Sequence, residues 1–193
     1  MLQRSVAITC ALLLLAGCAG TSGTPETSSA VVRADAIAVS VPDYSEMSFL
    51  AKKNEANTGS CNGGNVSPPV QWSHGPTATK SYAVMMSDPD GARGRGSTHW
   101  IAYNISPTTT SLAEGAGSTE TSAFTHGKNQ AGQEQYRGPC PSAGDRPHHY
   151  IIGVYALDLE PGALHAGLDR EKFIAAVAEH SLSYASVVLL YAR

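Results

Sequence analysis

The chain has 193 residues and a formal net charge of −3 at pH 7, with 13 Lys and Arg against 16 Asp and Glu. This balance, without a run of basic residues, argues against a nucleic-acid-binding protein. Beyond residue 17 the sequence has the length of one ordinary domain, and none of its apolar segments is long enough to cross a bilayer.

Residues 1–17 predict an export signal, in which Arg4 precedes an apolar run from Val6 to Ala16. The run is shorter than a helix that spans the roughly 30 Å hydrocarbon core of a bilayer. It ends in the sequence LAGC, which resembles the bacterial lipobox. The resemblance implies cleavage before Cys18 and a lipid anchor on that cysteine, with acyl chains such as palmitate. An ordinary secretory signal with an incidental cysteine is the alternative interpretation.

Residues 18–35 are expected to form a lipidated, flexible tether, because the stretch 19–30 consists mainly of Ser, Thr, Gly and Pro. Such a composition cannot bury enough apolar surface to fold. The folded ligand-binding domain is predicted to span residues 36–193. The lipid would hold this domain at the cell membrane, on its extracytoplasmic face.

The domain is predicted to consist mostly of strands, with one good helix near its end. Five segments have the alternation or the apolar continuity of strands: 37–41, 81–87, 99–105, 148–157 and 184–191. Asp169 is a suitable N-cap for a helix, because Phe173, Ile174, Val177 and Ala178 follow it at the spacing of one helical face. The segments 88–98, 106–123 and 127–147 are expected to be long loops, where functional residues usually lie.

Two cysteines, Cys61 and Cys140, lie within the predicted domain. Outside the reducing cytoplasm, an even pair is a candidate disulfide. It would close a loop of roughly 80 residues and contribute about 4 kcal/mol on the chain-entropy model. Two buried free thiols are the alternative, since the sequence does not show whether the two Cα atoms approach within bonding range.

Polar residues that could carry chemistry gather at the ends of the predicted strands. Asp88 follows one apolar strand, and His99 begins the next. The stiff turn GPCP covers residues 138–141, and the sequence HHY at 148–150 opens the strongest strand. Because side chains alternate along a strand, the first and third residues of HHY share one face, while His149 points to the other.

If those strand ends are adjacent, Asp88, His99, His148 and Tyr150 converge. The two imidazoles and the phenol would offer N–H and O–H donors, and the carboxylate would favour the charged imidazolium and orient its ring. Such a set suits an anionic group, for example a phosphate or a carboxylate. The alternative is that Asp88 belongs to a simple turn and that His99 is a satisfied core residue.

Several segments, in chain order, resemble the phosphatidylethanolamine-binding protein family, in particular its bacterial YbhB/YbcL-like (Raf kinase inhibitor-like) branch. SPPVQW at 67–72 looks like the family's S-P-P-(apolar)-x-W segment. SYAV through DPD at 81–90, followed by HW at 99–100, is similar to its first conserved block. GKNQAG, YRGPCP, HHY and YALD complete the series, which runs from about Cys61 to Asp158. The order and spacing make the resemblance specific.

The resemblance implies an antiparallel β-sandwich with a few short peripheral helices, one of them near the C-terminus, and a small anion-binding pocket at one end. The implied ligand-binding residues are Asp88, His99, His148 and Tyr150, and the implied pocket wall consists of Pro89, Gly138, Pro139 and Pro141. The chain departs from the family pattern at the rim. His149 takes the place of the arginine in H-R-Y, so any ion pair of that arginine is expected to be lost or weakened.

Two further departures lie beside the implied pocket. Ser142 replaces a second proline after GPCP, and a proline usual in the first loop is absent from its place. The loop 91–96 is instead rich in glycine, so it is expected to be mobile. Arg93 and Arg95 in this loop are expected to come within reach of an anion.

The leading hypothesis is an envelope lipoprotein that binds a small phosphate-bearing ligand or a phospholipid headgroup without catalysis. The sequence contains no nucleophile elbow, no metal-spaced Cys/His set and no glycine-rich phosphate loop before a helix. Enzyme activity, a cofactor and a metal are therefore not expected. The alternative is an inhibitor or regulator of a protease or another protein, acting through loops at the pocket rim. The sequence does not decide whether the chain forms a homodimer.

Overall fold

The computed structural model describes residues 36–193, so the predicted export signal, Cys18 and the tether lie outside the described residues. The domain consists mainly of two antiparallel sheets. The smaller sheet has the order β1-β2-β5, with β1 Val39–Ser40, β2 Val70–Trp72 and β5 Ser111–Leu112. The larger sheet has the order β6-β4-β3-β7-β8, with β6 Thr125–His126, β4 Ser97–Ile105, β3 Ser81–Asp88, β7 His148–Leu157 and β8 Ser181–Tyr191. The predicted β-sandwich is confirmed.

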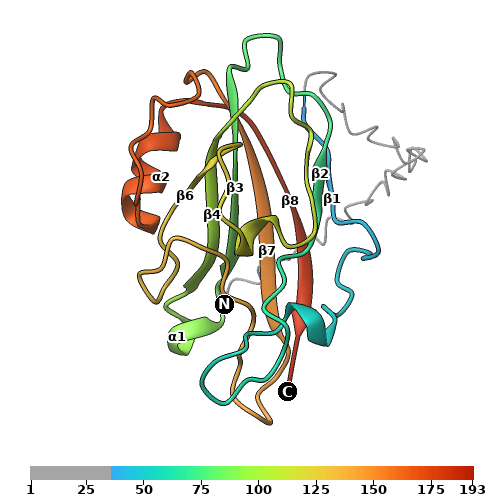
Figure 1. Ribbon diagram of the computed structural model, residues 1–193. Helices are drawn as coiled ribbons and strands as arrows, with labels where there is room; N and C mark the ends of the chain where they lie inside the picture. Colours follow the sequence, from blue (N-terminus) through green and yellow to red (C-terminus); the bar gives the residue numbers. More distant parts are fainter. Residues whose placement is uncertain (1–35) are drawn as a thin grey trace, which may run out of the picture. The chain divides into compact units, whose positions relative to one another are not determined.

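Short helices lie around the sheets. They are α1 Gly91–Gly94, α2 Arg170–Ala178, and the 3₁₀ turns η1 Lys52–Asn54 and η2 Ala116–Ser118. Figure 1 shows α2 beside one face of the larger sheet, with β1 and β2 on the other side of that sheet. No helix within residues 36–193 has the length and hydropathy needed to cross a bilayer.

The central strand β3 is buried on both faces, which explains its continuous apolar sequence. Tyr82, Val84 and Met86 face the smaller sheet and belong to the main core. Ala83 and Met85 alternate with them and pack on the opposite side, in a second core beneath α2. The larger sheet thus has a core on each of its faces.

The helix predicted near the C-terminus is confirmed as α2. The carboxylate of Asp169 accepts a hydrogen bond of 2.9 Å from the N–H of Lys172, which is the predicted N-cap. Phe173 and Val177 are buried under the helix. Ile174 is 37% exposed, so the buried stripe is narrower than predicted.

Four of the five predicted strands are confirmed, and two of them, β4 and β8, begin two or three residues earlier than predicted. The fifth, predicted at 37–41, is present only as the two residues of β1. β4 begins at Ser97 and β8 at Ser181, because each pairs over its full length with a long neighbour. The strands β2, β5 and β6 were not predicted. They have two or three residues each, which is too short for an alternating pattern.

The predicted disulfide is present. Cys61 and Cys140 are 79 residues apart in the sequence, and their Cα atoms lie 5.9 Å apart. Arg193 supports the same region, because its guanidinium donates to the sulfur of Cys61 at 3.1 Å and to the carbonyl oxygen of Pro141 at 3.2 Å. The disulfide and Arg193 together fix the segment that follows Gly138.

Candidate ligand-binding site

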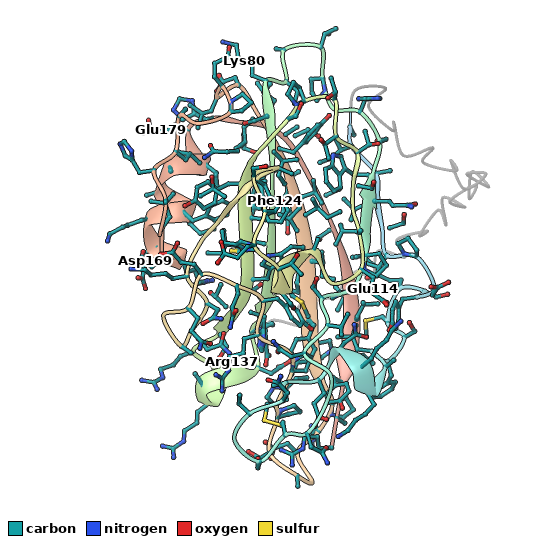
Figure 2. The ribbon with its side chains drawn as sticks, viewed as in Figure 1. Lys80, Glu114, Phe124, Arg137, Asp169 and Glu179 are labelled. Atoms are coloured by element: carbon teal, nitrogen blue, oxygen red, sulfur yellow. A yellow bond between two sulfur atoms is a disulfide. The ribbon has the colours of Figure 1, made fainter. Side chains whose placement is uncertain are left out.

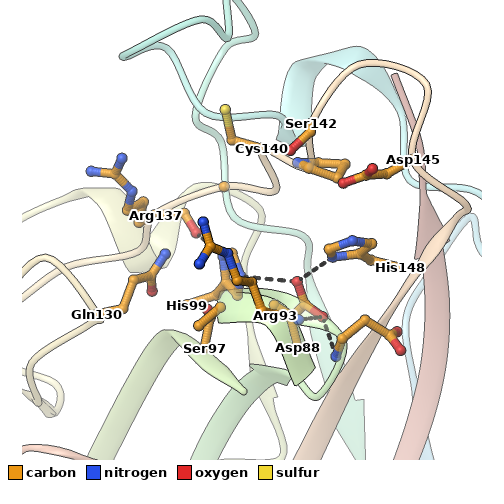
Figure 3. A pocket seen from close by; sticks show the side chains of 15 residues that line it. Asp88, Arg93, Ser97, His99, Gln130, Arg137, Cys140, Ser142, Asp145 and His148 are labelled. Atoms are coloured by element: carbon orange, nitrogen blue, oxygen red, sulfur yellow. Dashed lines mark hydrogen bonds and ion pairs between the residues drawn. The ribbon is translucent and has the colours of Figure 1, made fainter. Parts of the chain in front are cut away.

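Three strands bring the predicted site residues to one end of the larger sheet. β3 ends at Asp88, which pairs with Ser97 at the start of β4, and β7 begins at His148 on the other side of β3. Because neighbouring strands are antiparallel, the end of β3 meets the beginnings of β4 and β7. A pocket of about 400 Å³ opens at this place, here called the first pocket, and Asp88, His99 and His148 line it (Figure 3).

Asp88 is fixed by hydrogen bonds to both of its carboxylate oxygens. It is 3% exposed, and its Oδ1 accepts from the backbone N–H groups of Asp90 and Gly91, each at 2.9 Å. Its Oδ2 accepts from Nδ1 of His148 at 2.8 Å. Nδ1 of His148 is therefore occupied, and Nε2 is the ring nitrogen left for a ligand.

His99 is held in one tautomer by the backbone. Its Nδ1 lies 2.7 Å from the carbonyl oxygen of Arg137, which can only accept, so Nδ1 carries the proton. Its buried Nε2 has no hydrogen-bond partner among residues 36–193 and lies 4.0 Å from Oδ2 of Asp88. Burial lowers the pKa of His99 below its ordinary value.

The lowered pKa changes the chemistry expected of His99. The sequence predicts that a nearby carboxylate favours an imidazolium, whereas in the structure desolvation outweighs the attraction of Asp88. The ring is therefore neutral near pH 7, and its Nε2 offers a lone pair instead of an N–H. A ligand group that carries a proton, or a proton taken up on binding, satisfies this nitrogen.

Tyr150 lies behind the pocket and does not line it. Its side chain is fully buried, and its ring stands edge-on against the ring of His99, with centroids 5.2 Å apart. Burial, followed by the neighbouring Asp88 carboxylate, raises the pKa of its hydroxyl. Tyr150 thus positions His99, and the structure gives it no direct access to a ligand.

The turn at residues 138–141 forms one wall. Gly138, Cys140 and Pro141 line the first pocket, whereas Pro139 is buried behind it and Pro89 is exposed outside it. The N–H of Gly138 donates to the side chain of Asn65 at 2.8 Å. The disulfide of Cys140 adds a second, covalent restraint on the wall.

Other polar residues in the first pocket were not predicted as ligand-binding residues. Asp90, Ser97, Gln130, Arg137 and Asp145 line it, and so does Arg93, which was expected to come within reach of an anion. Most of them come from loops, whose positions in space do not follow from hydrophobic periodicity. Arg137 had a local signal, because it stands directly before the GPCP turn. The backbone N–H of Arg137 also donates to the carbonyl oxygen of His99 at 2.8 Å, which brings the two residues together.

The sequence model described as phosphatidylethanolamine-binding protein matches residues 45–192. The chain belongs to the phosphatidylethanolamine-binding protein family. A family relative from Methanothermobacter thermautotrophicus, named UPF0098 protein, is 39% identical over 140 residues, which cover 69% of this chain and 87% of the relative. A second, the UPF0098 protein YbcL of Escherichia coli, is 38% identical over 128 residues, which cover 58% of this chain and 70% of the relative.

A solved structure and a further relative support the same family. The crystal structure of Escherichia coli YbcL superposes with a TM-score of 0.76 and 30% identity, and covers 81% of this chain and 98% of its own. LppC of Mycobacterium tuberculosis, whose name makes it a candidate lipoprotein, is 40% identical over 124 residues. The matched region covers 62% of this chain and 58% of LppC.

His149, which stands where the family pattern has an arginine, contacts Asp90 at the rim of the first pocket. The backbone N–H and Nδ1 of His149 both lie 2.8 Å from Oδ2 of Asp90. These hydrogen bonds lower the pKa of Asp90 below its ordinary value. In place of the family arginine, a histidine therefore holds the acidic residue that follows Pro89.

The glycine-rich loop 91–96, which differs from the family pattern, contains the short helix α1. Ala92 and Arg93 both have left-handed backbone conformations, with φ of 51° and 60°. Non-glycine residues adopt this region at a cost of about 1 kcal/mol or more each. Arg93, although exposed, is among the residues that line the first pocket, and Figure 3 labels it there.

Acid is expected to destabilise the fold through His99. Because the pKa of His99 is lowered in the folded state, the unfolded chain takes up its proton first as the pH falls through the ordinary value of 6.5. The contribution is fully present above that value and is lost below it. Thermal unfolding between about pH 8 and pH 5 should show a falling Tm, with a smaller fall in His99→Gln. Equal falls in both proteins would contradict this assignment.

Proposed function

We propose that this family member is an envelope lipoprotein that binds a small phosphate-bearing ligand in the first pocket without catalysis. The observation that carries the proposal is the unpartnered Nε2 of His99, which faces Asp88 in a pocket that two arginines also line. Within residues 36–193 neither Arg93 nor Arg137 has an ion-pair partner. Guanidinium groups are suited to phosphate, because they donate several hydrogen bonds in a fixed plane.

The donor and acceptor pattern fits a hydrogen phosphate. The two arginines and the hydroxyl of Ser97 can donate to phosphate oxygens, while His99 Nε2 accepts the P–OH proton or takes it up. His148 Nε2 adds a further polar contact beside Asp88. A fully deprotonated anion binds only if a proton enters with it, so affinity should increase as the pH falls.

The hydrogen bonds to Asp88 support the part of the proposal that excludes catalysis. Both of its oxygens accept hydrogen bonds, which leaves this carboxylate poorly placed to act as a base or nucleophile. In the part of the chain that the structure describes, no three His, Cys, Asp or Glu side chains are arranged to hold a metal ion. The lipid anchor rests on the LAGC sequence at Cys18 and on the likeness to LppC.

Removal of His148 is expected to weaken phosphate binding by at least tenfold, because a charge-assisted contact contributes about 1.5–3 kcal/mol. Calorimetric titration with ethyl phosphate would measure the Kd of His148→Ala and of Asp88→Ala. Asp88→Ala should show the larger loss, since it releases the ring of His148 and also leaves the backbone N–H groups of Asp90 and Gly91 without their acceptor.

His180→Ala provides a matched control. His180 makes the same type of contact, with its Nδ1 2.8 Å from Oδ1 of Asp158, outside the first pocket. Its removal should leave the affinity for ethyl phosphate unchanged. If His148→Ala and Asp88→Ala bind ethyl phosphate as tightly as the unmodified protein, and circular dichroism shows that both are folded, the proposed function is wrong.

A further inference from the structure

A second pocket adjoins the first. It has a volume of about 250 Å³ and is lined by Arg95, Lys128 and Arg170, among other residues. Ser97 and Gln130 line both pockets and therefore form the wall between them. Gln130 is fixed against β4, because its backbone N–H donates to the carbonyl oxygen of Thr98 at 2.8 Å. An extended molecule seated in the first pocket can thus continue over this shared wall into the second.

The positive charges of the domain are divided unequally. Five basic side chains form ion pairs with carboxylates: Lys52, Lys53, Lys80, Lys172 and Arg193. Among residues 36–193, six others have no ion-pair partner, namely Arg93, Arg95, Lys128, Arg137, Arg146 and Arg170. All of these except Arg146 line the first or the second pocket. Because these cations have no ion-pair partner among the described residues and line two adjoining pockets, their charges are available to an anionic ligand.

The second pocket has two acidic residues, Asp169 and Glu171, against three cations. Asp169 is already engaged, since its carboxylate caps α2 and lies 3.4 Å from the ammonium group of Lys172. Because this cap occupies the first turn of the helix, the side chains of the pocket, and not the helix end, are the groups available for binding. Glu171 is the other acidic residue, and it has no ion-pair partner within the described part of the chain. The three cations of the second pocket therefore outnumber its two carboxylates, one of which is engaged by the helix cap and by Lys172.

Hydrogen bonds restrain the side chain of Arg95 and the backbone of Lys128. Arg95 Nε donates to the carbonyl oxygen of Ala92 at 3.1 Å, which ties its side chain to α1. The backbone N–H of Lys128 donates to the carbonyl oxygen of Leu168 at 2.8 Å, which holds Lys128 beside the start of α2. The restraint on its side chain reduces the entropy that Arg95 loses when it binds an anion.

We propose that the second pocket is an anion subsite for a second phosphate of the ligand whose first phosphate occupies the first pocket. The ligand class is therefore a bisphosphate, either soluble or part of a lipid headgroup. This inference rests on the function proposed above for the first pocket. The hydroxyl of Ser97 and the amide of Gln130 at the shared wall suit a polar linker between the two phosphates.

Calorimetric titration with ethyl phosphate and with propane-1,3-diol bisphosphate tests the subsite. The bisphosphate should bind at least tenfold more tightly than the monoester. Lys128→Gln and Arg170→Gln should each reduce bisphosphate affinity about fivefold and leave ethyl phosphate affinity unchanged. Lys80→Gln is the matched control, because Lys80 is exposed, pairs with Glu160 and lies at the end of the sheet opposite Arg137 (Figure 2). It should change neither affinity.

The two proposals fail in different ways. If ethyl phosphate binds and His148→Ala weakens that binding at least tenfold, but the bisphosphate gains nothing and Lys128→Gln has no effect, the subsite is wrong and the first pocket stands. If ethyl phosphate does not bind, the function proposed for the first pocket is wrong. The bisphosphate could then still bind, with an affinity that Lys128→Gln reduces and His148→Ala does not. This result would show an anion site in the second pocket alone, and it would overturn the proposal that one ligand occupies both pockets.

Vesicles distinguish the two sources of a bisphosphate. The protein is mixed with phosphatidylcholine vesicles that contain either cardiolipin, which has two phosphates, or phosphatidylglycerol at the same total charge. Tighter sedimentation with cardiolipin, lost in Arg170→Gln, assigns the ligand to the lipid. Equal sedimentation together with tight binding of the soluble bisphosphate assigns it to a soluble molecule. Preference for neither the cardiolipin vesicles nor the soluble bisphosphate overturns the proposal.

Discussion

Replacement of both Cys61 and Cys140 by alanine is expected to lower the free energy of unfolding by about 4 kcal/mol. The disulfide joins residues 79 positions apart, and the chain-entropy model assigns a closure of this length an effect of that size. Cys140 also lines the first pocket, so ethyl phosphate should bind more weakly to the variant. Urea denaturation of the oxidised protein and of the double variant would measure the difference.

Reduction of the unmodified protein is the internal control for the disulfide. Treatment with dithiothreitol should lower the stability of the unmodified protein to that of the double variant, and it should not affect the double variant itself. The variant should still fold, because Arg193 continues to donate to the carbonyl oxygens of Ser60 and Pro141. An unchanged urea midpoint in the double variant would show that the disulfide does not stabilise the domain.

Gly138→Ala is expected to destabilise the protein by about 3 kcal/mol, which is at the upper end of typical overpacking effects. A Cβ atom at this position would lie 2.2 Å from the carbonyl oxygen of Asn54 and 2.5 Å from the backbone nitrogen of Ala56. Both contacts are with backbone, which cannot rotate away as a side chain can. The insertion must therefore displace the pocket wall or the segment 54–56, and ethyl phosphate affinity should fall as well.

The matched control for Gly138→Ala is Gly144→Ala in the same long loop. Gly144 has φ of +84°, and a Cβ atom added there would have no other atom within 4 Å. Alanine at this position therefore strains the backbone but causes no steric clash. Its expected cost is about 1 kcal/mol, with no effect on the pocket. Urea denaturation of both variants compares the two costs. Equal stability of the two variants would indicate that the wall yields easily and does not shape the site.

The sequence predicted the parts of the fold that strong periodicity governs. β3 was predicted correctly because both of its faces are buried, which requires an uninterrupted apolar run. The adjacency of Asp88, His99 and His148 followed from strand ends and from the family resemblance. The strands β2, β5 and β6 were missed because pairing with a neighbour, and not their own composition, makes them strands.

The site was predicted only in part, because the placement of Tyr150 and the protonation state of His99 depend on tertiary packing. Tyr150 shares the neighbourhood of Asp88 with His148, yet the ring of His99 packs against it and Tyr150 does not line the pocket. The protonation state of His99 depends on how deeply it is buried, and the sequence contains no measure of that depth. The remaining polar lining comes largely from loops, as with Arg137, whose approach to His99 depends on a backbone pairing across 38 residues.

The edge strand β8 has a further consequence, for self-association. Residues 47–50 pair with its second half, through hydrogen bonds from Met47 to Val188 and from Leu50 to Leu190. An uncovered edge accepts a strand from another molecule, which is a common start of aggregation. Residues 47–50 therefore cover this part of the edge of β8 and keep it from pairing with another molecule. Chains in which it has not yet docked expose the edge, so concentrated refolding should yield more aggregate than dilute refolding.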